Sequence, residues 1–194
     1  MLFYIETRRE KMKKVILVLA LFFLSTIIFS AESLSSVYTS TKSKDCKRLA
    51  GIYKKLYPVS DEYGYGAEEC PGYKNMKLFA VYDDSRVWVD ISDGVNTWST
   101  MNQVYNADFG HFPALREGVA EWRVAKSGEV KALIFRVDAQ DPDIIGKIHS
   151  RLFVISFDKG APKYCGNAKT NEEAVKMADR GNCTIKLDLT EQDK

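Results

Sequence analysis

Residues 119–137, VAEWRVAKSGEVKALIFRV, contain the pattern that decides the fold. Two runs in which apolar residues recur at every second position flank the turn residues 126–129, which predicts a β-hairpin. With a two-residue loop, Trp122 lies opposite Leu133 on the neighbouring strand. Side chains alternate across a strand, so one face of the hairpin is apolar and should face the core. That face holds Ala120, Trp122, Val124, Leu133, Phe135 and Val137.

Other strands are predicted on both sides of the hairpin. Residues 78–82 and 86–91 have strand composition around a short turn, and residues 151–157 form another apolar run. In residues 86–91, Val87, Val89 and Ile91 share one face, which leaves Arg86, Trp88 and Asp90 on the other.

Helical signals are fewer and lie near the two ends of the exported part. Thr170 with Glu173 three residues later forms a capping box, and Gly181 is suited to end the helix. Residues 46–57 have partial helical spacing, and the glycine-rich residues 58–75 are expected to be a loop.

These elements predict an α+β fold. It would consist of an antiparallel sheet of about five to seven strands with one C-terminal helix packed on it. A mostly-β sandwich is the alternative. Residues 184–189, in which Ile185, Leu187 and Leu189 alternate with other residues, are expected to add an edge strand.

The N-terminal segment predicts export. Met12-Lys13-Lys14, an apolar run over residues 15–29 and small residues after it are typical of a signal peptide. We therefore expect residues 1–30 to be removed and residues 31–194 to form a single exported domain, periplasmic or secreted. Met12 is an alternative start of translation. The apolar run is shorter than the roughly 20 residues of a membrane-spanning helix, so we expect no stable membrane anchor after cleavage.

Charge does not favour nucleic acid as a partner. Five of the 28 Lys and Arg residues and two of the 26 Asp and Glu residues lie in residues 1–30. The remaining 23 basic and 24 acidic side chains nearly balance. The basic pI of about 8.2 is therefore largely an effect of the leader, and the exported part lacks the basic excess of nucleic-acid-binding domains.

The four cysteines, Cys46, Cys70, Cys165 and Cys183, all lie in the exported part. In an oxidising compartment they predict two disulfides, with three possible connectivities. Pairing of sequence neighbours would close two short loops, each worth on the order of 3 kcal/mol. A four-cysteine zinc site is the weaker alternative, because no two of the cysteines are spaced as C-x-x-C.

Catalytic and cofactor motifs are missing from the sequence. His111 and His149 are the only histidines, and we expect both to be loop residues without a catalytic role. H-E-x-x-H, G-x-S-x-G and glycine-rich phosphate loops do not occur. We therefore expect no cofactor and no bound metal. Asp83, Asp84 and Arg86 could do acid–base chemistry or hold calcium, but Asp and Ser are common in turns and we favour that explanation.

Tyrosine is concentrated in one part of the chain. Seven of the ten tyrosines are Tyr38, Tyr53, Tyr57, Tyr63, Tyr65, Tyr73 and Tyr82. Tyr63-Gly64-Tyr65-Gly66 alternates tyrosine with glycine, as adaptable recognition surfaces do. Packing of half-exposed rings against the domain explains the same residues, yet this is the best candidate contact surface in the sequence.

Several short motifs also occur in a characteristic order. They are Tyr38-Thr39-Ser40 with Asp45-Cys46, Glu69-Cys70-Pro71-Gly72-Tyr73, Asp84-Ser85-Arg86, Glu121-Trp122-Arg123, and Cys165 followed by Asn171, Ala174 and Ala178-Asp179. In this order the chain resembles a group of exported bacterial single-domain proteins to which no activity is assigned. The resemblance covers nearly all of the exported part. It implies an exported bacterial domain and supplies no catalytic residues.

Two functional hypotheses follow. The leading one is a non-catalytic exported domain that binds a protein or glycan of the cell envelope. Its binding residues would be Tyr63, Tyr65 and Tyr73, with Asp84 and Arg86 nearby. The alternative is an envelope hydrolase that uses carboxylates around Asp83, Asp84 and Glu121.

Overall fold

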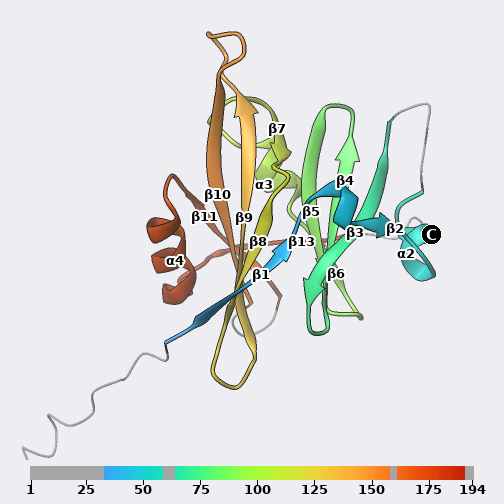
Figure 1. The fold of residues 1–194 in the computed structure, drawn as a ribbon, viewed down its shortest axis with the longest axis vertical. Coiled ribbons are helices and arrows are strands. Elements are labelled where there is room, and N and C mark those ends of the chain that lie inside the picture. The colour runs from blue at the N-terminus through green and yellow to red at the C-terminus, as the bar shows by residue number, and fades with distance from the viewer. Residues whose placement is uncertain (1–32, 59–63, 158–160, 191–194) are drawn as a thin grey trace, which may run out of the picture. The chain divides into compact units, whose positions relative to one another are not determined.

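Strands make up most of the regular structure (Figure 1). The computed structural model describes residues 33–58, 64–157 and 161–190, so the expected signal peptide lies outside the described residues. Within these ranges the strands belong to one sheet of 13 strands. The fold is thus mostly β with a C-terminal helix packed on the sheet. The expectation of about five to seven strands is wrong, because several strands have only two or three residues and show no alternation.

The strands are β1 (Ser35–Ser40), β2 (Lys47–Arg48), β3 (Gly66–Tyr73), β4 (Met76–Asp83), β5 (Arg86–Ser92), β6 (Thr97–Ser99), β7 (His111–Leu115), β8 (Val119–Val124), β9 (Val130–Gln140), β10 (Ile148–Ser156), β11 (Lys163–Ala168), β12 (Ile185–Lys186) and β13 (Asp188–Leu189). The helices are the 3-10 turn η1 (Ser43–Asp45) and the α-helices α2 (Ile52–Leu56), α3 (Met101–Tyr105) and α4 (Asn171–Arg180).

The predicted hairpin is formed by β8 and β9. Trp122 lies opposite Leu133, as expected. Next to the turn the register shifts by one residue, because the Ala125 N–H donates to the Glu129 carbonyl at 2.9 Å. The loop is therefore residues 126–128, one residue longer than predicted, and a β-bulge restores the expected register. All six residues of the predicted apolar face are buried in the main core, which confirms the orientation of the hairpin.

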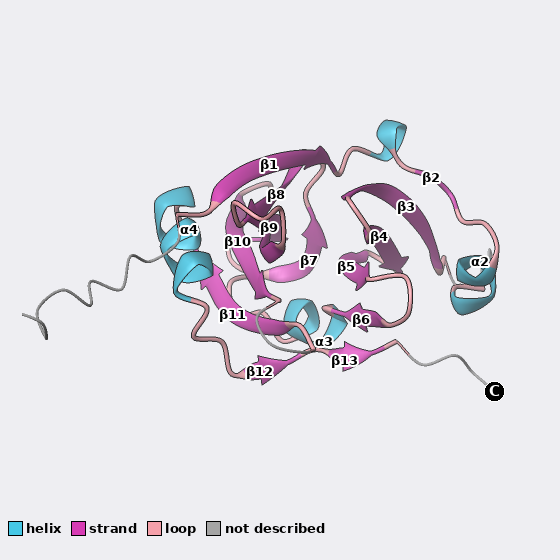
Figure 2. Ribbon diagram, turned by 90° about the horizontal axis from the view of Figure 1, so that it is seen from below, coloured by secondary structure: helices cyan, strands magenta, loops and turns pink. Residues whose placement is uncertain are grey.

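The strands form a closed circuit (Figure 2). From β9 the hydrogen-bonded neighbours run through β10 and β11 to β12, and from β13 through β6, β5 and β7 back to β9. Residues 185–189 supply both β12 and β13, so one short segment joins two edges of the sheet. Leu187, between the two strands, is buried in the core, and its N–H donates to the Pro162 carbonyl at 3.0 Å. The expected edge strand thus exists and closes the sheet.

Helix α4 covers the second face of β9 and β10. Its capping box forms as predicted, since the Glu173 N–H donates to Thr170 Oγ1 at 3.2 Å and Glu173 Oε2 accepts from the Thr170 N–H. Gly181 ends the helix in the left-handed conformation. Ala174 and Ala178 are buried against a second apolar cluster, whose strand residues are Ala132, Ile134, Leu152, Val154 and Ala168.

The segment before β4 differs from the expectation. Residues 66–73 form β3 where a loop was predicted, and the helix at residues 46–57 shrinks to α2. Pro71 and Gly72 fall where the register between β3 and β4 shifts, so proline is tolerated there without a ladder N–H. A Cβ at Gly72 would lie 2.0 Å from the Met76 carbonyl oxygen, so this bulge requires glycine.

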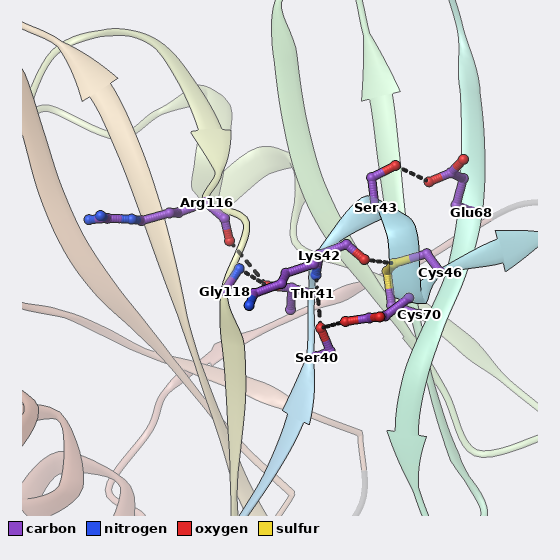
Figure 3. The surroundings of a disulfide bond; sticks show 10 residues. Ser40, Thr41, Lys42, Ser43, Cys46, Glu68, Cys70, Arg116 and Gly118 are labelled. Atoms are coloured by element: carbon purple, nitrogen blue, oxygen red, sulfur yellow. Dashed lines mark hydrogen bonds between the residues drawn. A yellow bond between two sulfur atoms is a disulfide. The ribbon is translucent and has the colours of Figure 1, made fainter.

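Two disulfides connect sequence neighbours, which settles the connectivity. Cys46 bonds Cys70, and Cys165 bonds Cys183 across α4. Figure 3 shows the first of these beside the segment that follows β1. There Thr41 Oγ1 accepts from the Gly118 N–H at 2.9 Å and donates to the Arg116 carbonyl at 3.1 Å. This segment therefore connects the start of β8 to β3.

Candidate functional site

The candidate site is a cavity of about 320 Å³ beside β5, β6 and β13, which we call the Asp90 cavity. Its lining residues include three acids and two aromatic residues, with Asn102 of α3 beside them: Asp83, Asp90, Asp188, Tyr65 and Trp88. The alternation of β5 places Asp90 and Trp88 on one face. That face is covered, because Trp88 is 3% exposed and Asp90 is 1% exposed.

Three separate parts of the chain meet at the Asp90 carboxyl. The Tyr57 hydroxyl, just after α2, donates to Asp90 Oδ2 at 2.7 Å. The Thr190 hydroxyl, just after β13, donates to the same oxygen at 3.0 Å. Thr190 is held in turn by its own N–H, which donates to the Thr97 carbonyl at 2.9 Å. The Asp90 carboxyl is therefore held by residues that are far from it in the sequence.

The other carboxyl oxygen has no such support. Asp90 Oδ1 and the indole Nε1 of Trp88 are buried without a hydrogen-bond partner among the residues that the structure describes. Burial raises the pKa of Asp90, and the hydroxyls of Ser99, Tyr57 and Thr190 and the Trp88 indole oppose that rise by favouring the charged form. The indole thus acts on the carboxyl through its charge distribution without making a hydrogen bond of normal geometry.

Burial and the neighbouring acid also affect Tyr57. The pKa of its hydroxyl lies far above the ordinary tyrosine value, first because of burial and second because of the nearby Asp90 carboxylate. Tyr57 therefore stays a hydrogen-bond donor throughout the physiological pH range. It also packs on Phe79 with ring centroids 5.6 Å apart, which fixes the ring.

The two other acids line the rim of the cavity. Asp188 Oδ2 accepts from Asn102 Nδ2 at 2.7 Å, and Asp83 Oδ2 accepts from the Tyr105 hydroxyl at 3.3 Å. The nearby Arg86 guanidinium lies over the Tyr105 ring, 4.7 Å from its centroid, and is not a lining residue. No lysine or arginine is among the residues described as lining the cavity.

The tyrosines of the leading hypothesis are only partly placed by the structure. Tyr63 lies outside the described residues. Tyr65 lines the Asp90 cavity, whereas Tyr73 pairs with Met76 at the opposite end of β3. Eight residues of extended chain separate the two tyrosines by roughly 25 Å. Tyr65 and Tyr73 therefore do not share one contact surface.

The charged residues of both hypotheses are also separated. Asp84 is exposed in the β4–β5 turn with a φ of 54°, as suits a turn residue, and Arg86 stacks on Tyr105. Glu121 lies on β8 and lines a different cavity, so it does not join Asp83. His111 is the first residue of β7, and His149 is the second residue of β10. Both are strand residues, so the expectation of loop positions is wrong.

Sequence reasoning missed Tyr57, Asn102, Asp188 and Thr190. The alternation in β5 correctly placed Asp90 beside Trp88, but nothing in the sequence indicates that this face is covered. Groups of three or more His, Cys, Asp or Glu residues placed to hold a metal ion do not occur in the described ranges.

In the described part of the chain, none of the helices is long and apolar enough to cross a membrane. Comparisons with protein-family models, with curated proteins and with solved structures find no match to this chain.

Proposed function

We propose that this chain is an exported, non-catalytic domain that binds a protein or glycan of the cell envelope through the Asp90 cavity. The observation that carries the proposal is Asp90 Oδ1, a buried oxygen without a partner among the described residues. Such an atom costs about 1–3 kcal/mol, and folded proteins contain few of them. A polar or positive ligand group in the cavity beside the carboxyl would offset part of this cost, and the aromatic residues Tyr65 and Trp88 also line the cavity, where a sugar ring or side chain would pack.

Export is supported by the two disulfides. Both pairs of cysteines are bonded, and such bonds persist in the periplasm or outside the cell, where thiols are oxidised. The resemblance to exported bacterial single-domain proteins points the same way. We therefore place the domain in the periplasm or the medium.

A binding role fits the state of Asp90 better than a proton-transfer role. The carboxyl is 1% exposed, and one of its oxygens is held by Tyr57 and Thr190. Proton transfer requires direct contact between the carboxyl and the reacting group of the substrate. A buried carboxyl can act through its charge on a ligand in the cavity without that contact.

The test is to fill the cavity with a bulky side chain and measure binding. Asn102 lines the cavity from an exposed position on α3, so Asn102→Trp should obstruct the cavity without disturbing the core. The matched control is Ile145→Trp, at a fully exposed position on the β9–β10 loop. We expect the purified protein to bind envelope glycan fragments or one envelope protein with a saturable isotherm. Asn102→Trp should weaken it at least about tenfold.

Binding that is equal in the two tryptophan variants would overturn the placement of the site. If the unaltered protein shows no saturable binding to either envelope fraction, the binding proposal itself fails.

A carboxylate hydrolase is the second candidate, because Asp83, Asp90 and Asp188 line one cavity. Glu121 has no part in this version, since it lines a different cavity. Incubation with glycan and ester substrates should then give product at a rate that Asp83→Asn abolishes. A lack of product from the unaltered protein would remove this candidate.

A further inference from the structure

The charged residues described as lining the Asp90 cavity are all acidic. Asp83, Asp90 and Asp188 line it, and no lysine or arginine does so among the described residues. In a partly enclosed space, charges of one sign raise the local concentration of opposite charges. Arg86 is not a lining residue, and its guanidinium lies 4.7 and 5.5 Å from the ring centroids of Tyr105 and Phe112.

Asp90 is buried without a cation. The described groups that act on it are the neutral hydroxyls of Tyr57, Thr190 and Ser99 and the neutral indole of Trp88, and it makes no ion pair among the described residues. Burying a carboxylate is costly unless a positive group accompanies it or the carboxyl takes up a proton. Asp90 and Trp88 both line the cavity, so a positive group in the cavity would lie close to the carboxyl.

Aromatic residues strengthen the preference of the cavity for a positively charged ligand. Trp88 and Tyr65 line the cavity, and the faces of such rings attract cations by about 0.5–2 kcal/mol. At about 320 Å³ the cavity lies at the low end of ligand-pocket volumes, so it suits a small molecule or a single group of a larger one.

We propose that the Asp90 cavity binds a primary ammonium group, as carried by an amino sugar or a small aliphatic amine. This inference rests on the proposed function of the cavity and specifies its ligand. The ammonium group would lie in the cavity beside Asp90 and Trp88, with Asp83 and Asp188 at the rim accepting hydrogen bonds from its N–H groups.

The test compares ligands that differ only in charge. Glucosamine and N-acetylglucosamine share a ring, and butylamine and butanol share a chain, but only the first of each pair is cationic at about pH 6. The indole N–H signals in an NMR spectrum report binding residue by residue. Trp88 should shift, while Trp122, whose indole donates to Thr39 Oγ1 at 2.9 Å on β1, should not.

We expect each amine to bind at least about tenfold more tightly than its neutral partner, a preference of the size of one cation–π contact plus one ion pair. Asp90→Asn should remove most of this preference. Asp143→Asn, an equal charge change on the exposed β9–β10 loop, should leave it unchanged.

Equal binding of amines and neutral partners, or no shift of Trp88 with any amine, would overturn the inference. In either case the cavity could still bind a neutral ligand. Binding of envelope glycan or protein that Asn102→Trp abolishes would then uphold the proposed function alone. If neither the preference for amines nor envelope binding that depends on Asn102 is observed, both proposals are rejected.

Discussion

Glu121 and Asp90 are both buried acids on strands of the same sheet, yet their surroundings are opposite. Glu121, 5% exposed, accepts from the Ser36 hydroxyl at 2.6 Å and lies 3.6 Å from Arg123 Nη1. Arg123 also donates from Nε and Nη2 to the two oxygens of Asp179 on α4, at 2.9 and 2.8 Å. Asp90 is more deeply buried and has no cation among the described residues.

The two acids differ in whether the protein itself compensates their buried charge. The bidentate pair with Asp179, followed by the neighbouring acids, raises the pKa of Arg123, so the guanidinium is charged at every physiological pH. The buried charges around Glu121 are therefore satisfied by the protein itself. At Asp90 the described residues supply only part of what a buried carboxyl requires, and we propose that a ligand supplies the remainder.

Removing Arg123 from its contacts with Glu121 and Asp179 should have the largest effect on the free energy of unfolding. Arg123→Met leaves Glu121 buried without its cation and α4 without its anchor on β8. We expect a loss of about 3–5 kcal/mol in the free energy of unfolding, measured in urea. Arg48→Met, at an exposed position on β2, should change it by no more than about 0.5 kcal/mol. Adding Glu121→Gln to Arg123→Met should restore part of the loss, and no restoration would contradict the role given to Glu121.

Removing the disulfide across α4 tests the contact between Arg123 and Asp179 by loosening the helix that carries Asp179. Replacing Cys165 and Cys183 by alanine frees a loop with a sequence separation of 18 residues, and should cost about 3 kcal/mol in urea unfolding. The change loosens the helix that carries Asp179. The Trp88 indole signal should stay in place, because α4 does not line the Asp90 cavity. A shift of that signal would show that the two sites are coupled.

Tyr57→Phe should have a smaller effect at the other acid. The hydroxyl donates to Asp90 Oδ2 at 2.7 Å, and its removal leaves the Thr190 hydroxyl as the one donor to that oxygen that we have described. We expect a loss of about 1–2 kcal/mol in urea unfolding at neutral pH. Tyr53→Phe is the matched control, since its hydroxyl contacts Ser92 at 3.3 Å and not Asp90. Equal losses in the two variants would argue against a special role of the carboxyl.

Asp90→Asn should show the smallest effect at acid pH and a growing one above it. The folded protein holds the pKa of Asp90 above its ordinary value of about 3.9, so the unfolded chain loses this proton first as the pH rises. Asp90 therefore favours folding less and less as the pH rises from about 4 towards the raised pKa. Relative to the unaltered protein, Asp90→Asn should gain stability across this range, measured by urea unfolding at several pH values. A constant difference would contradict the raised pKa.

The sequence predicts one half of this comparison much better than the other. Trp122 opposite Leu133, the capping box of Thr170 and Glu173, and the burial of the β8–β9 apolar face all follow from local patterns with periods of two or three to four residues. These patterns place Glu121 and Arg123 together on the opposite face. Asp179 could not be assigned to them, because its contact depends on how α4 packs.

The Asp90 cavity depends on contacts that no local pattern records. Thr190 is 100 residues from Asp90 in sequence, and Tyr57 is 33 residues away. The strand β3 was not predicted because Pro71 and Gly72 are turn residues in most contexts. Here they occupy a bulge. Two-residue strands such as β12 and β13 exist only because the neighbouring edges are in place.

Closure of the sheet by residues 185–189 also makes two distant edges depend on one short segment. Without this segment, β11 and β6 would each have an edge of unpaired N–H and C=O groups. Such edges can pair with other copies of the chain, and pairing between segments far apart in sequence is slow to form. The same segment places Thr190 beside Asp90, so protection of the two edges and completion of the cavity depend on the same few residues.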